Sequence, residues 1–110
     1  VVRRGGRVET SGASIEKMPA KFVMLPGNAR IRRVEIEKRM ASLRELAETM
    51  AENRLEEGAR SRGFVTSGVS YNYVKEAFPE AAVLKLGMVW PLPERKIRAF
   101  ADQVDELIVV

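Results

Sequence analysis

The sequence contains no cysteine and no histidine among its 110 residues. It therefore cannot form a disulfide, and it lacks the usual protein ligands of zinc, haem and iron–sulfur clusters. Only weak sites built from oxygen ligands stay open to a metal ion. Without a histidine base, and with no pattern that supports a serine–lysine pair, the hydroxyls of Ser67 and Ser70 have no activating neighbour. The sequence thus predicts no catalytic residue and no metal site.

Long apolar runs are also absent. No stretch reaches the roughly 18 to 20 apolar residues that a membrane helix needs. The Arg3-Arg4-Gly5-Gly6 start has no apolar signal region behind it. We therefore expect a cytoplasmic protein with no membrane partner.

The net charge of +4 is distributed unevenly along the chain. Residues 1–33 hold eight Lys/Arg against two Glu, whereas residues 34–58 hold four against seven and residues 59–110 hold seven against six. The basic excess thus lies before the part that we expect to be compact. A solvated linker explains the Arg30, Arg32 and Arg33 cluster better than an acidic partner or a cofactor phosphate does, and a basic nucleic-acid-binding module is the less favoured alternative.

Three regions can be distinguished along the chain. Residues 1–31 are expected to form an extended approach segment, partly disordered, in which the apolar ribbon 18–29 is too short for a helix. Residues 32–58 are expected to form a long amphipathic helix with Gly58 as its C-cap. Its apolar stripe consists of Ile36, Met40, Leu43, Ala47 and Met50.

Residues 59–110 predict a β-α-β-α-β core. Strands are expected near 63–66, 82–86 and 107–110, with helices at 69–77 and 93–104 between them. Short crossovers of this kind make the strands parallel, so the fold class is α/β with a three-layer parallel sheet. The unbroken apolar run of the last strand predicts burial on both of its faces. Because the chain ends on that strand, we expect an excised fragment that self-associates through the 36–50 stripe or the exposed sheet.

Ligands of an open parallel sheet bind beyond the carboxyl ends of its strands. The first such end carries a polar turn whose candidate anion-binding residues are Thr66, Ser67, Gly68 and Ser70. Backbone N–H groups that open a helix can hold a phosphate or a carboxylate. The favoured alternative is that Ser67 or Ser70 is only an N-cap and that Gly68 relieves a tight turn. No dinucleotide fingerprint or P-loop is present.

Three aromatic residues near this edge, Tyr71, Tyr73 and Trp90, could stack on a base. We favour structural roles for them, with Tyr73 and Val74 packed on the sheet and Trp90 anchoring a domain contact.

Three blocks of the sequence resemble one known family. They are Phe22 to Arg30, the TSGxSYxYVKE block within Gly63 to Glu76, and the LKLGMVxPLP block within Leu84 to Pro93. Together they resemble the alpha subunit of indolepyruvate ferredoxin oxidoreductase over about residues 21–110. Within that family, this region is similar to the middle domain, which is similar in turn to the carboxyl-terminal domain of transketolase.

The resemblance implies what the parent enzyme does. It would use thiamine diphosphate, Mg and [4Fe–4S] clusters to decarboxylate arylpyruvates oxidatively, giving aryl-acetyl-coenzyme A and reduced ferredoxin. None of these cofactors is expected on this fragment, which would be an inactive structural domain. Its implied partners are the other domains of the same subunit, a beta subunit and, through the parent, ferredoxin. A coenzyme A phosphate at the Thr66 to Ser70 turn is the alternative small-ligand function.

Overall fold

The computed structural model describes residues 5, 6, 12 and 14–110. Residues 1–4, 7–11 and 13 of the extended approach segment predicted over residues 1–31 lie outside this range. By its internal contacts the chain divides into two units, Val1–Arg33 and Val34–Val110.

The first unit contains the one-turn helix α1 (Pro19–Phe22) and the start of helix α2 (Pro26–Thr49). The prediction that the ribbon 18–29 is too short for a helix was therefore wrong. Both helices begin with a proline, because a missing N–H costs nothing in the first turn. Between them, the Asn28 side-chain amide donates a 2.9 Å hydrogen bond to the Val23 carbonyl.

Helix α2 ends at Thr49 and does not continue to Glu57 as predicted. The chain turns after it and forms the short strand β1 (Arg54–Glu56), which runs antiparallel to β3 (Ala81–Leu86). Gly58 is consequently not a helix cap. A Cβ atom there would lie 2.5 Å from the Ala81 carbonyl carbon and from the Glu80 oxygen, so glycine allows two backbones to approach closely.

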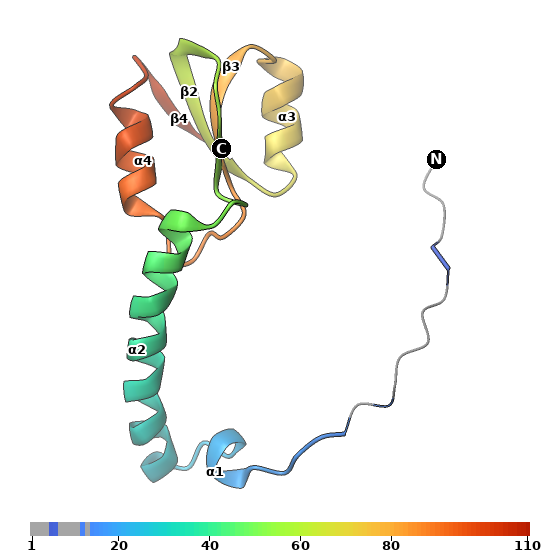
Figure 1. Cartoon of the computed structure of the whole chain (residues 1–110), viewed down its shortest axis with the longest axis vertical. Helices are drawn as coiled ribbons and strands as arrows, with labels where there is room; N and C mark the ends of the chain where they lie inside the picture. The colour runs from blue at the N-terminus through green and yellow to red at the C-terminus, as the bar shows by residue number, and fades with distance from the viewer. Residues whose placement is uncertain (1–4, 7–11, 13) are drawn as a thin grey trace. The chain divides into compact units, whose positions relative to one another are not determined.

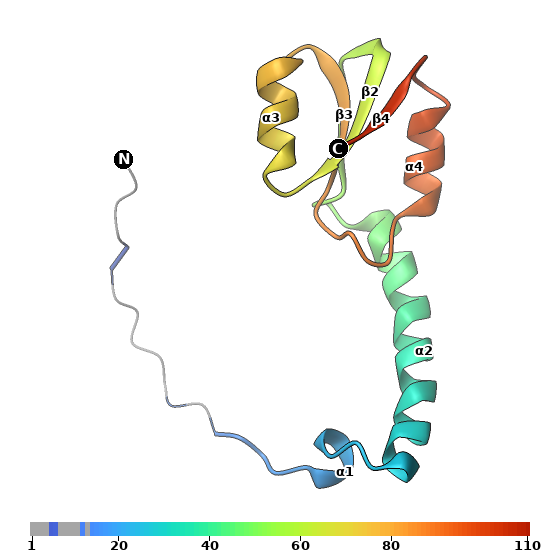
Figure 2. The same ribbon diagram turned by 180° about the vertical axis from the view of Figure 1, so that it is seen from behind.

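The expected α/β core is present. Strands β2 (Ala59–Ser67), β3 and β4 (Leu107–Val109) are parallel, and the full sheet order is β1-β3-β2-β4. Helices α3 (Ser70–Ala77) and α4 (Glu94–Ala101) cover opposite faces of this sheet (Figures 1 and 2). The predicted three-layer arrangement is confirmed, with one antiparallel strand added at the β3 edge.

Alternation along the strands separates the core into two apolar layers. Under α4 the buried side chains are Val65, Ala82, Leu84, Leu86 and Phe100, and under α3 they are Phe64, Val74, Ala81 and Val83. Successive residues of a strand point to opposite faces, so β2 and β3 supply both layers.

Strand β4 is not buried on both faces. Among the strands that the structure describes it pairs with β2 alone, and the Val109 side chain is 76% exposed. The backbone N–H of Val110 and the backbone carbonyl of Glu106 bond to β2. The backbone N–H and carbonyl groups of Leu107 and Val109 therefore point away from β2. The apolar run thus forms a partly exposed strand at the end of the sheet order, and the prediction that it is buried on both faces was wrong.

Candidate functional site

The carboxyl ends of β2 and β3 lie side by side, with Ser67 paired to Leu86. From these ends the chain enters α3 on one face of the sheet and α4 on the other (Figure 1). Two adjacent strands whose connections leave to opposite faces mark the point where open α/β sheets bind ligands. The candidate turn at Thr66 to Ser70 follows the first of these strands.

Within this turn, Gly68 has a φ of +54°, a conformation that favours glycine, which confirms its predicted conformational role. The predicted serine N-cap was wrong. The N-cap of α3 is Val69, no side chain caps the helix, and Ser70 is its first residue. Thr66 is buried, and its hydroxyl has no hydrogen-bond partner.

The aromatic residues near this edge differ in their placement. Val74 packs on the sheet as predicted, but Tyr73 is 64% exposed and does not. Trp90 is also exposed. The Tyr71 hydroxyl bonds to Glu56. Among the described residues, the stacked ring pair is Phe64 with Phe78, and Tyr71, Tyr73 and Trp90 do not stack on one another.

A buried amide that sequence reasoning missed holds this edge together. Asn53, which is 1% exposed, accepts hydrogen bonds at Oδ1 from the N–H groups of Gly87 (2.8 Å) and Met88 (2.9 Å). Its Nδ2 donates to the Ala47 carbonyl at 2.8 Å. One side chain therefore fixes the end of α2 to the loop that follows β3.

The start of α4 is fixed to α2 in a similar way. The Glu48 carboxylate accepts hydrogen bonds from the N–H groups of Arg95 (2.9 Å) and Lys96 (3.1 Å), so it caps a helix distant in sequence. Nearby, Arg95 donates to Glu45 at 2.7 Å. This hydrogen bond, with the negative charges of Glu45 and Glu48, raises the pKa of Arg95.

A polar cluster lies on the α3 side of the sheet around Tyr71. The Tyr71 hydroxyl donates to Glu56 at 2.8 Å, and the Arg54 Nε donates to the same carboxylate oxygen at 3.0 Å. Lys75 lies 3.5 Å from the other oxygen of Glu56, and the Lys85 ammonium lies 4.2 Å from the centre of the Tyr71 ring. We call these five residues the Tyr71 cluster.

Partial burial disfavours the charged form of Glu56, and the groups around it outweigh this effect. The hydrogen bonds from Tyr71 and Arg54 and the charges of Arg54 and Lys75 lower the pKa of Glu56 below its ordinary value. The hydrogen bond with Tyr71, followed by the one with Glu56, raises the pKa of Arg54. Glu56 is therefore held as a carboxylate and is not available as a general acid near neutral pH.

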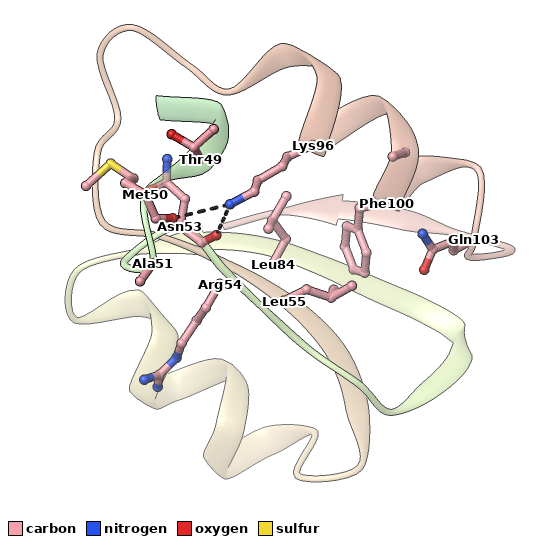
Figure 3. Close-up of a pocket in the computed structure, with 11 residues that line it drawn as sticks. Thr49, Met50, Ala51, Asn53, Arg54, Leu55, Leu84, Lys96, Phe100 and Gln103 are labelled. Atoms are coloured by element: carbon pink, nitrogen blue, oxygen red, sulfur yellow. Dashed lines mark hydrogen bonds between the residues drawn. The ribbon is translucent and has the colours of Figure 1, made fainter. Parts of the chain in front are cut away.

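Two hollows adjoin these groups. One, of about 370 Å³, is lined by Ala51, Glu52, Arg54, Lys85 and Gly87. The other, of about 350 Å³, lies on the α4 side (Figure 3), with Leu55, Leu84 and Phe100 among its lining residues. Lys96 enters this second hollow, but its ammonium is already bonded to the carbonyls of Met50 (3.3 Å) and Asn53 (2.7 Å).

Neither hollow contains a recognisable set of catalytic groups. Among residues 5, 6, 12 and 14–110, no group of three or more acidic side chains could hold a metal ion. None of the helices in the same residues has the length and apolar character needed to cross a bilayer.

Comparison with known proteins gives one consistent match. The chain is 32% identical to indolepyruvate oxidoreductase subunit IorA of Methanothermobacter marburgensis over 94% of its length. It is 33% identical to the subunits of the same name from Methanothermobacter thermautotrophicus, over 100% of the chain, and Archaeoglobus fulgidus, over 93%.

The chain covers only 17% to 19% of these three relatives. No family model matches it, and no solved structure matches it. The shared positions extend over almost the whole chain, including the compact unit Val34–Val110 described above. The chain therefore belongs to the family of indolepyruvate oxidoreductase subunit IorA, of which it represents a part.

Proposed function

We propose that this chain is a non-catalytic structural domain of an indolepyruvate ferredoxin oxidoreductase, equivalent to its middle, transketolase C-terminal-like domain. The supporting observation is that nearly the whole chain matches a small part of subunit IorA. In this proposal the complete enzyme oxidatively decarboxylates arylpyruvates to aryl-acetyl-coenzyme A and passes the electrons to ferredoxin.

The residues of this chain do not fit the cofactors of such an enzyme. A [4Fe–4S] cluster needs thiolate ligands, and the sequence has no cysteine. A magnesium diphosphate site needs carboxylate or amide oxygens close together, and among the described residues no group of three or more acidic side chains is placed to hold a metal ion. Thiamine diphosphate, Mg and the clusters are therefore assigned to other parts of the parent.

The partners follow from the same proposal. The domain would pack against the other domains of its subunit and contribute to contact with a beta subunit, and ferredoxin would meet only the parent enzyme. A cytoplasmic location, expected from the sequence, belongs to the same proposal.

Calorimetry tests the structural assignment. The 110-residue chain is titrated with thiamine diphosphate in the presence of Mg²⁺, and we expect no heat of specific binding. Tight, stoichiometric binding would overturn the proposal. A complete indolepyruvate oxidoreductase, titrated in the same buffer, shows that the cofactor solution is competent.

A second candidate function is anion binding at the Thr66 to Ser70 turn. The first turn of α3 has no side-chain cap. This favours anion binding, because the free backbone N–H groups of that turn can donate hydrogen bonds to a phosphate. Addition of coenzyme A should shift the amide NMR signals of Gly68 and Ser70. Unchanged signals at both positions would remove this candidate.

A further inference from the structure

The Tyr71 cluster contains more positive than negative charge. Arg54, Lys75 and Lys85 surround the single carboxylate of Glu56. The surrounding unit has the opposite balance, since residues 34–110 hold eleven Lys/Arg against thirteen Asp/Glu. This local excess of positive charge favours the binding of an anion.

The sheet register explains why these cations meet. Arg54 on β1 is the direct partner of Lys85 on β3, and Lys85 is the direct partner of Thr66 on β2. Direct partners project on the same face, so the three side chains form one row across neighbouring strands. The row lies on the α3 side, where Tyr71 contacts both cations.

Lys85 is the cation of the row whose ammonium group has no carboxylate partner among the described residues. Its ammonium contacts the Tyr71 ring. Among the residues that the structure describes, no carboxylate lies within ion-pair distance of it. Glu56 is shared between Arg54 and Lys75 instead. An ammonium ion held on an aromatic face keeps its N–H donors available for a ligand.

The hollow beside this row has room for an organic molecule. It measures about 370 Å³ and is lined by both Arg54 and Lys85, which is within the size range of small-molecule sites. The Nε and Nη2 groups of Arg54 already bond to Glu56 and Tyr71, so the site offers a phosphate the positive charge of Arg54 together with the N–H donors of the Lys85 ammonium. Glu52, which lines the same hollow, would repel a phosphate directly but could accept hydrogen bonds from hydroxyl groups attached to it.

We propose that the hollow lined by Arg54 and Lys85 binds a phosphate group, carried by a small hydroxyl-bearing ester such as a nucleotide or a sugar phosphate. The site goes beyond the two functions proposed above. None of its lining residues belongs to the Thr66 to Ser70 turn, and its existence does not depend on what the parent enzyme catalyses.

The test is an NMR and calorimetric titration of the full chain with adenosine 5′-monophosphate, inorganic phosphate and adenosine. We expect saturable binding of the monophosphate, shifts of the amide signals of Arg54, Lys85 and Gly87, and no binding of adenosine. Equal affinity for inorganic phosphate would identify the free ion as the ligand, and tighter binding of the monophosphate would identify the ester. Absence of saturable binding by both phosphates overturns the proposal.

Two variants and a matched control locate the site. Lys85→Met keeps the aliphatic stem and removes the charge, so it should weaken binding about tenfold or more, and Arg54→Gln should do the same. Lys38→Met makes the same charge change at an exposed α2 lysine paired with Glu35, and it should bind like the parent chain. Equal binding by Lys85→Met and Lys38→Met would contradict the proposal.

The Thr66 to Ser70 turn is tested separately by Gly68→Ala, which strains a backbone at positive φ. Loss of binding in Gly68→Ala with full binding in Lys85→Met and Arg54→Gln would favour the turn and overturn the cation site. The opposite pattern would support the cation site and remove the turn. Circular dichroism of each variant confirms that it is folded, and if Lys85→Met fails to fold, Arg54→Gln and the signal shifts of the parent chain decide the outcome.

Discussion

Replacement of Asn53 by alanine should destabilise the compact unit by about 3 kcal/mol. The side chain is 1% exposed and makes three hydrogen bonds to backbone groups, at 2.8 to 2.9 Å. Each such bond contributes about 1 kcal/mol net, and a buried group left unpaired costs more. Because Gly87 is exposed, water can reach part of the opened site and bond to the groups left unpaired. We therefore count about 1 kcal/mol for each of the three lost hydrogen bonds.

This loss is a large part of the 5 to 15 kcal/mol that typically separates a folded domain from its unfolded state. For a domain of this size it corresponds to a fall in Tm of roughly 12 to 24 °C. Urea denaturation followed by circular dichroism measures the change in the free energy of unfolding, and the slope m checks that the unfolding reaction stays the same.

The matched control is Asn72→Ala, which removes the same side chain from an exposed position on α3. Its stability should stay within about 0.5 kcal/mol of the parent chain. If Asn53→Ala lost less than about 1 kcal/mol at an unchanged m, the fixing role given to Asn53 would be wrong.

Three further predictions concern close packing, pH and association. Gly58→Ala should lose about 1 to 3 kcal/mol because its Cβ would meet the Ala81 backbone, whereas Gly27→Ala, with nothing within 4 Å, should not destabilise the chain; equal stability of the two variants in urea would refute this. The pKa of Glu56 is lowered in the folded chain. The Glu56 carboxylate therefore stabilises the folded state at pH values above its ordinary pKa of 4.5, and this stabilisation is lost as the pH falls through the pKa of the folded state. The stability difference between the parent chain and Glu56→Gln should thus shrink in acid, and a difference constant with pH would contradict the assignment. We also expect the chain to self-associate through its free β4 edge, so Val109→Lys should lower the mass measured by light scattering; a monomeric parent chain would refute that expectation.

The β-α-β-α-β core could be predicted because its signals are local. Apolar runs of strand length and the Gly68 turn each act within a few residues. The two strands 82–86 and 63–66 were therefore located correctly, although β2 begins earlier, at Ala59.

The end of α2 could not be predicted from local pattern. Leu55 flanks the apolar stripe of the predicted helix, yet it belongs to β1. The helix ends where Asn53 and Glu48 bond to residues after β3, and these contacts join positions that are distant in sequence. The burial of β4 was mispredicted for a similar reason, since an apolar run does not show how many neighbours a strand has.

In the candidate site, too, the features set by local sequence could be predicted and those set by distant contacts could not. The turn from Thr66 to Ser70 was visible as a polar interruption between a strand and a helix. The row formed by Arg54, Lys85 and Thr66 depends on strand register. The sequence predicts a helix over residues 32–58, which places Arg54 away from the sheet. A β1 strand that pairs with residues 83–85 is the signal that would have placed Arg54 beside Lys85.

The most direct test of the central claim is a turnover assay of the chain by itself. The protein is supplied with indolepyruvate, coenzyme A, thiamine diphosphate, Mg²⁺ and a viologen dye as electron acceptor, beside a complete indolepyruvate oxidoreductase as positive control. A purely architectural domain should give dye reduction no faster than buffer. Reduction that rises in proportion to the concentration of this chain would contradict the account.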